Sequence, residues 1–149
     1  MNKLPAYFKS WPTLLLSFVV LFSACKADKT TTEVNPTTLE GTWEFIGYQR
    51  INEALDKGND DVQENPVVEF KQGSYGGSTP NNAFAGSYTL IENDGIVMST
   101  PSSTLANETQ WGARFLSNLP NASHFVMQNN QLQVYLKDTE GWMVFQPKK

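Results

Sequence analysis

The chain has 149 residues, with 15 acidic and 11 basic side chains. Domains most often contain about 100 to 150 residues, so this length allows one folded domain after a leader. Two basic residues and no acidic residue precede Cys25, so the chain from that cysteine onward has a formal balance of 9 minus 15, or −6. An acidic surface repels phosphate groups, which argues against nucleic acid as a partner and against charge-driven binding to anionic membranes.

A short hydrophobic segment at residues 14–22 follows an amino end that carries two lysines. The small residues Ser23 and Ala24 lead from this segment into Cys25, the only cysteine of the chain. Such an order is typical of a signal peptide, and a membrane span would need roughly 20 apolar residues. The small residues before the cysteine resemble the lipobox of bacterial lipoproteins. We therefore predict a lipoprotein signal peptide over residues 1–24 and lipid attachment at Cys25, with secretion without lipid as the alternative.

Residues 25–38 contain almost no large apolar side chain. Such a segment cannot offset the entropy that it would lose on ordering. We predict a flexible tether that is anchored by lipid, followed by one monomeric folded domain over residues 39–149. Its localisation would be the bacterial cell envelope, in the outer membrane or on the periplasmic face.

The domain begins with a segment of strand periodicity at residues 42–48. Trp43, Phe45 and Gly47 alternate with polar or smaller positions, and Tyr48 falls on the opposite face from Trp43. This two-residue period predicts a half-buried strand.

Further short strands follow, separated by turn residues. An Asp94-Gly95 step between apolar runs favours a hairpin, and we interpret the glycine-rich residues 73–79 as a loop next to a binding surface. The remaining predicted strands lie at residues 67–71, 86–92, 96–99, 123–128, 131–137 and 142–146.

One segment, residues 105–119, has helical periodicity. Trp111, Phe115 and Leu119 fall on one side of a helix, and the hydroxyl of Thr104 is the predicted amino-terminal cap. Glu108 would then lie in the first turn, where a carboxylate favours the helix dipole. The predicted fold class is therefore mainly β with one helix (α+β), a small antiparallel sheet that is partly closed into a barrel, with the helix over an open edge or end.

Several motifs cover nearly all of the domain. They are Leu39-Glu40-Gly41-Thr42-Trp43, Asn82-x-Phe84-x-Gly86-x-Tyr88, Thr104-x-Ala106, Leu132-x-Val134-x-Leu136 and Met143-x-Phe145. Together they resemble the META or heat-shock HslJ-like family, whose members are small antiparallel β proteins of the bacterial envelope, often lipoproteins. The resemblance implies a non-enzymatic role in binding a partner protein or in envelope stress maintenance. It also implies that Asn81 and Asn107, which stand where many members have paired cysteines, lie near each other.

A second resemblance leaves an alternative function open. Gly41-Thr42-Trp43 is similar to the Gly-x-Trp motif of lipocalin-like barrels, whose interior can hold one small ligand. The alternative is therefore a carrier of a small apolar ligand. A lined cavity inside the sheet would favour the carrier, and a filled core would favour a binding surface on the outside.

The residues that could perform chemistry do not converge in the sequence. His124 is the only histidine, and no serine stands in a Gly-x-Ser-x-Gly setting. We predict no enzymatic activity, no cofactor and no metal. A possible binding rim consists of four aromatic residues, of which the last two are expected more as core residues than as ligand contacts: Tyr75, Phe84, Tyr88 and Trp111.

The lipid prediction is testable by replacing Cys25 with serine. Because the chain has no other cysteine, the variant cannot be acylated there and should move from the membrane fraction to the soluble fraction. Cell fractionation and immunoblotting measure this, with Ser102→Ala as the matched control. A Cys25→Ser variant that sediments with membranes as fully as the parent would show that the lipid prediction is wrong.

Overall fold

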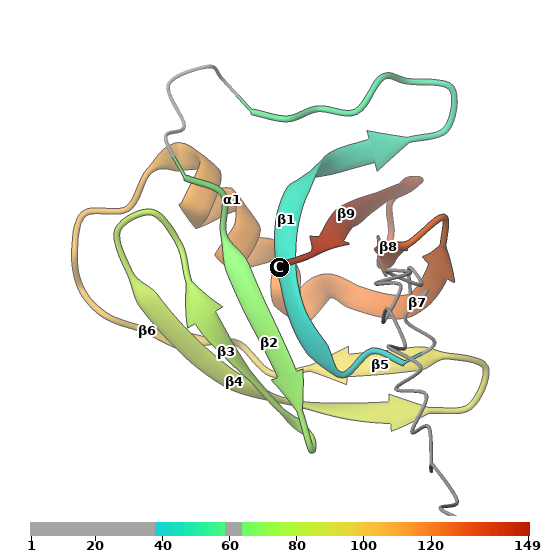
Figure 1. Ribbon diagram of the computed structural model, residues 1–149, viewed down its shortest axis with the longest axis horizontal. Coiled ribbons are helices and arrows are strands. Elements are labelled where there is room, and N and C mark those ends of the chain that lie inside the picture. Colours follow the sequence, from blue (N-terminus) through green and yellow to red (C-terminus); the bar gives the residue numbers. More distant parts are fainter. Residues whose placement is uncertain (1–37, 59–63) are drawn as a thin grey trace, which may run out of the picture. The chain divides into compact units, whose positions relative to one another are not determined.

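Nine strands, one short α-helix and one 3-10 turn make up the part of the chain that the computed structural model describes, residues 38–58 and 64–149 (Figure 1). The predicted signal peptide, Cys25 and the tether up to residue 37 lie outside the described residues. No helix in the described ranges is long and apolar enough to cross a membrane. The strands are β1 (Gly41–Arg50), β2 (Val67–Lys71), β3 (Ser74–Ser78), β4 (Ala83–Ile91), β5 (Gly95–Met98), β6 (Ser102–Ser103), β7 (Ala122–Gln128), β8 (Gln131–Leu136) and β9 (Gly141–Pro147), with α1 (Gln110–Asn118) and η1 (Leu119–Asn121) between β6 and β7.

Eight of these strands form a closed antiparallel barrel. Their order is β3-β2-β1-β9-β8-β7-β5-β4, and β4 pairs back with β3 to complete the ring. The short β6 lies outside the ring and pairs with β4 beyond the end of β5. The prediction of a mainly antiparallel β fold with one helix is confirmed, and the sheet is closed rather than partly closed.

The strand β3 corrects the prediction of a loop at residues 73–79. It pairs with β2 on one side and with β4 on the other, and Tyr75 points into the core with 2% of its surface exposed. Gly76 and Gly77 hide the strand in the sequence, because they have no side chains with which to show alternation. Since β3 completes the barrel, its deletion should unfold the domain rather than remove only a surface loop.

A bulge in β1 corrects the predicted face of Tyr48. The pairing of β1 with β9 shifts between Phe45 and Gly47, so one extra residue enters β1 there. A bulge of this kind reverses the alternation beyond it. Tyr48 consequently lies in the core with Trp43 and Phe45, at 6% exposure.

Large side chains fill the interior of the barrel. The ring of Phe45 lies at its centre, 5.0–5.4 Å from the ring centroids of Tyr48, Trp111, Phe115 and Phe145. Trp111 and Phe115 belong to α1, which packs over one end of the barrel beside β1 (Figure 1). Near the start of β1, the indole nitrogen of Trp43 donates a hydrogen bond to the carbonyl of Leu39 at 2.9 Å.

The helix begins five residues later than the predicted cap would place it. Thr109 is the observed cap, because its side-chain oxygen accepts from the amide of Gly112 at 3.0 Å. The prediction of Thr104 as the cap is wrong: its hydroxyl donates to Asn82 Oδ1 at 2.8 Å. Glu108 precedes the cap and so does not lie in the first turn of the helix.

The close pairing of β2 and β3 predicts different tolerances for two adjacent glycines. A Cβ atom at Gly77 would overlap the carbonyl oxygen of Val67, whereas one at Gly76 would lie 3.2 Å from the carbonyl oxygen of Phe84. Gly77→Ala should therefore lower the free energy of unfolding by about 3 kcal/mol or more, and Gly76→Ala by about 1 kcal/mol or less. Urea unfolding of both variants measures this. Equal losses would contradict the register of β2 and β3.

Candidate functional site

The four residues of the predicted rim lie in the core. Tyr75, Phe84, Tyr88 and Trp111 are 2%, 4%, 7% and 5% exposed. Burial raises the pKa of Tyr75, and its hydroxyl donates to the carbonyl of Ser99 at 2.7 Å. None of the four rings therefore faces solvent enough to serve as a broad binding platform, although Phe84 lines a small depression of about 300 Å³ beside β4 and β6.

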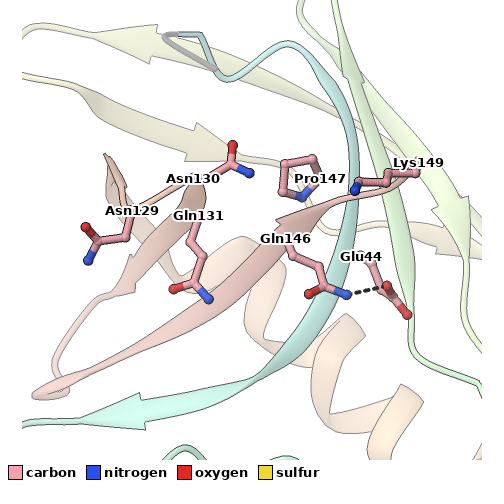
Figure 2. A pocket seen from close by; sticks show the side chains of 7 residues that line it. All are labelled: Glu44, Asn129, Asn130, Gln131, Gln146, Pro147 and Lys149. Carbon is pink, nitrogen blue, oxygen red and sulfur yellow. Dashed lines mark hydrogen bonds between the residues drawn. The ribbon is translucent and has the colours of Figure 1, made fainter. Parts of the chain in front are cut away.

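One open surface lies across the outer faces of β1, β9 and β8. It consists of two depressions of about 540 and 500 Å³, and both are lined by Gln131. We call them together the outer trough. The first depression is also lined by Gln49, Arg50, Ile51, Asn52, Leu55, Gln133, Trp142 and Val144. The second is also lined by Glu44, Asn129, Asn130, Gln146, Pro147 and Lys149 (Figure 2).

Strand alternation produces this surface. Leu132 and Val134 of β8 are buried, so Gln131 and Gln133 between and beside them point outward. Across the ladder, Gln133 stands opposite Val144 of β9. The strands predicted at 131–137 and 142–146 therefore already imply which side chains point outward. From the sequence, roles were assigned only to the side chains that point inward.

Next to the bulge in β1, the segment that follows this strand forms a wall of the surface. Gly47 stands opposite Val144 and has no side chain with which to fill the space between the strands. Instead, Leu55 covers this position, because a Cβ atom on Gly47 would lie 3.0 Å from its Cγ atom. Leu55 is thus a wall of the first depression rather than part of the sheet.

Asp56 holds that wall in place. Its backbone exchanges two hydrogen bonds with Tyr48, at 2.9 and 2.8 Å, and its carboxylate pairs with Arg114 of α1 at 2.7 Å. The hydrogen bond from Arg114 lowers the pKa of Asp56, with a further contribution from the amide of Gly58. Burial raises the pKa of Tyr48 to about 12. The loop after β1 is therefore fixed both to its own strand and to the helix.

A row of stacked rings borders the trough. The rings of His124 and Tyr135 lie 4.3 Å apart at 15°, and those of Tyr135 and Trp142 lie 5.1 Å apart at 26°. Trp142 lines the first depression, is only partly buried, and its Nε1 has no hydrogen-bond partner among the described residues. The stack therefore fixes the orientation of an indole at the trough.

The amide groups of the trough are only partly engaged. Gln49 Nε2 donates to the carbonyls of Arg50 and Glu53, and Gln133 Oε1 accepts from the hydroxyl of Tyr135 at 3.3 Å. The Gln131 side chain has no hydrogen bond to any described residue. Gln131, the Nε2 group of Gln133 and the Oε1 atom of Gln49 thus remain open to a ligand.

The second depression holds the charged groups of the trough. Figure 2 shows Gln146 turned toward Glu44, to which it donates at 2.8 Å, and Glu44 also accepts from Asn65 at 3.4 Å. Glu44 is therefore occupied by two amides. Its neighbour Lys149 is the cationic group among the residues lining this depression.

A separate polar cluster joins residues 79–82 to the segment before α1. The side chain of Asn82 makes four hydrogen bonds of 2.8–3.0 Å, which involve Thr104, Ala106 and Glu108. Thr79 also donates to Glu108. Because these polar groups are satisfied by one another, we assign the cluster a structural role.

The expected proximity of Asn81 and Asn107 is confirmed at the edge of this cluster. Asn81 Nδ2 donates to the carbonyl oxygen of Asn107 at 2.6 Å. A hydrogen bond thus joins the two segments where the resemblance places a pair of cysteines.

One contact brings together groups that act in hydrolases. Ser123 Oγ lies 3.1 Å from His124 Nδ1 and also donates to the carbonyl of Tyr135 at 3.1 Å. A hydroxyl has one hydrogen, so a serine that donates to this carbonyl can only accept from His124, which requires the tautomer with a proton on Nδ1. Within the described ranges, no three His, Cys, Asp or Glu side chains gather as a metal site.

Comparisons with known proteins support the fold. No protein-family model matches the chain, and no curated protein matches its sequence. Its structure is similar to the crystal structure of a DUF4847 family protein from Bacteroides vulgatus ATCC 8482, with a TM-score of 0.57 and 17% identity over 74% of this chain and 94% of the other. A similarity at this identity shows the fold alone. The chain is thus a small antiparallel β-barrel, and the META or HslJ-like resemblance stays a prediction.

The polar cluster predicts how stability depends on pH. Burial raises the pKa of Glu108, but hydrogen bonds from Thr79, Asn82 and Thr109 outweigh burial and lower the pKa. A carboxyl group whose pKa is lower in the folded state stabilises the fold above its unfolded pKa of about 4.3, and loses that effect as the pH falls through the folded value. Urea unfolding should show that Glu108→Gln costs most at neutral pH and least in acid. A cost independent of pH would contradict this, and exposed Glu140→Gln is the control.

Proposed function

We propose that this protein is a non-enzymatic binding protein of the bacterial cell envelope, tethered by lipid on Cys25, and that it binds through the outer trough. The contrast between the two sides of the sheet carries this proposal. Side chains such as Phe45, Phe115 and Phe145 fill the inside without exposure to solvent. The outside offers a concave surface with the amide of Gln131, the partly bonded amides of Gln49 and Gln133, and an oriented indole.

The filled interior does not favour the alternative of a lipocalin-like carrier. Phe45 at the centre has four ring neighbours within 5.4 Å, and α1 covers one end of the barrel. A small apolar ligand would have to displace several of these rings. Removal of a buried phenylalanine side chain costs about 3 to 5 kcal/mol of stability. A small ligand in its place would have to make contacts worth more than that cost.

The arrangement of polar groups supports the non-enzymatic part of the proposal. Ser123 uses its hydrogen on a backbone carbonyl, so His124 does not receive it as a general base would. Glu108 is held in its ionised form by four neighbouring donors. Both groups act in hydrogen bonds that stabilise the fold.

The closed barrel also supports the proposal that the domain is a monomer. A closed ring has few free strand edges, and β6, with two residues, is the short strand added outside it. Free edges are the usual route to association between sheets. We therefore propose a monomeric domain that meets its partner, in envelope maintenance or stress, through side chains rather than by strand pairing.

Photo-crosslinking in intact cells tests the proposed function. A photoreactive residue in place of Gln131 should form an adduct with the bound partner, and the same residue in place of Thr89 should not. Thr89 is exposed on β4, which is four strands from β9 in the ring. Mass spectrometry should include protein, glycan and lipid adducts. Equal labelling from both positions, or none from Gln131, would contradict binding at the outer trough.

A further inference from the structure

We propose that the ligand of the outer trough is a neutral oligosaccharide, that is, a sugar chain without charged groups. This inference rests on the proposed function, because it takes the trough as the binding surface. It adds the chemical class of the ligand. Four properties of the trough support it: its charge, its hydrogen-bonding groups, its aromatic ring and its shape.

The charge of the first depression argues against ionic ligands. Arg50 is the charged residue among those that line it, and its guanidinium lies 4.0 Å from the carboxylate of Glu53. Phosphate and carboxylate ligands are usually bound by clusters of cations or by bidentate arginines. Metal ions such as calcium need several carboxylates. This depression offers neither arrangement, whereas a neutral ligand needs neither.

The hydrogen-bonding groups match hydroxyl groups. An amide side chain carries both a donor and an acceptor, and a sugar hydroxyl likewise donates and accepts. Gln131 is open at both ends of its amide, Gln133 at its Nε2 group and Gln49 at its Oε1 atom. Gln131 and Gln133 lie two residues apart on β8, and Gln49 lies on β1 with β9 between the two strands; all three line the first depression. They can therefore satisfy several hydroxyls of one ligand at once.

The ring of Trp142 supplies the apolar part of such a site. The face of a sugar ring presents C–H groups, and the face of an indole carries partial negative charge that attracts their positive hydrogens. Tyr135 stacks on Trp142 at 5.1 Å, and His124 stacks on Tyr135 at 4.3 Å. This packing holds the indole before a ligand arrives, so less rotational freedom is lost on binding.

The shape of the trough favours a chain over a compact molecule. The depressions of about 540 and 500 Å³ share Gln131 as a lining residue; Trp142 lines the first, and Pro147 and Lys149 line the second. Each volume falls within the range of about 300 to 1,000 Å³ that is usual for ligand sites. An open surface of this length allows several linked sugar units to lie across the strands. An extended peptide would instead require unpaired backbone groups, which the ladders of β1, β9 and β8 already use.

Titration with defined sugars tests the inference. The probes are neutral hexasaccharides of glucose, mannose, xylose and N-acetylglucosamine, added to the purified full-length protein labelled with nitrogen-15. The indole signal of Trp142 should shift, while those of the buried Trp43 and Trp111 should not. Binding should persist in concentrated salt, because no ion pair is formed. A sulfated hexasaccharide should bind no more tightly than its neutral counterpart.

Variants assign the binding to the trough. Trp142→Ala should weaken the best probe about tenfold, since the sugar loses its contact with the aromatic face, and Trp142→Phe should restore part of that loss. Gln131→Ala should weaken it about threefold to tenfold through loss of hydrogen bonds. The matched control is Thr89→Ala on β4, which should not change the affinity more than about twofold, because the ligand does not touch this strand.

Two outcomes would overturn the inference. One is that none of the neutral hexasaccharides binds, and the other is that binding is unaffected by Trp142→Ala and Gln131→Ala. If crosslinks from Gln131 then identify a protein or peptide, the sugar class is wrong while the proposed function stands. If Gln131 also gives no adduct, both proposals fail.

Discussion

The packing of Phe45 is the interaction on which the rest of the structure depends. Its ring joins β1 to β9 through Phe145 and joins both strands to α1 through Trp111 and Phe115. Removal of such a ring costs about 3 to 5 kcal/mol, a large part of the usual stability of about 5 to 15 kcal/mol. The central ring therefore does two things at once: it holds the helix over the barrel and it occupies the space where a carrier would hold its ligand.

A filled interior moves any binding surface to the outside, and the bulge in β1 connects the two sides of the sheet. The extra residue turns Tyr48 inward, where it packs edge-on against Phe45 at 5.0 Å. At the same irregularity Gly47 stands opposite Val144, and because it has no side chain, Leu55 and Asp56 can pack against the outer face there. One local change in register thus completes the core and gives Leu55, a wall of the trough, its place on the outer face.

The parts of the fold that the sequence predicted are those set by local pattern. The alternation of Trp43 and Phe45, the Asp94-Gly95 turn and the single helix follow from neighbouring residues. What it could not predict depends on contacts between distant segments. The strand β3 forms because β2 and β4 flank two glycines, and the helix starts late because Asn82, 22 residues before Thr104, binds the hydroxyl of that threonine. The core role expected for Tyr88 and Trp111 agrees with their burial, but Tyr75 and Phe84 are buried too, because β3 and the closure of the barrel depend on contacts between distant segments.

The trough also differs from the chemistry of the chain as a whole. The chain from Cys25 onward is acidic, with a balance of −6, so its surface repels anionic polymers at long range. A neutral chain experiences no such repulsion, and the amides around Trp142 offer it hydrogen bonds at short range. A single open, shallow site of this kind would bind its ligand weakly. Lipid anchoring would offset that weakness, because many copies held on one membrane could bind a single long chain together, and a second contact made by a tethered neighbour needs no further encounter from solution.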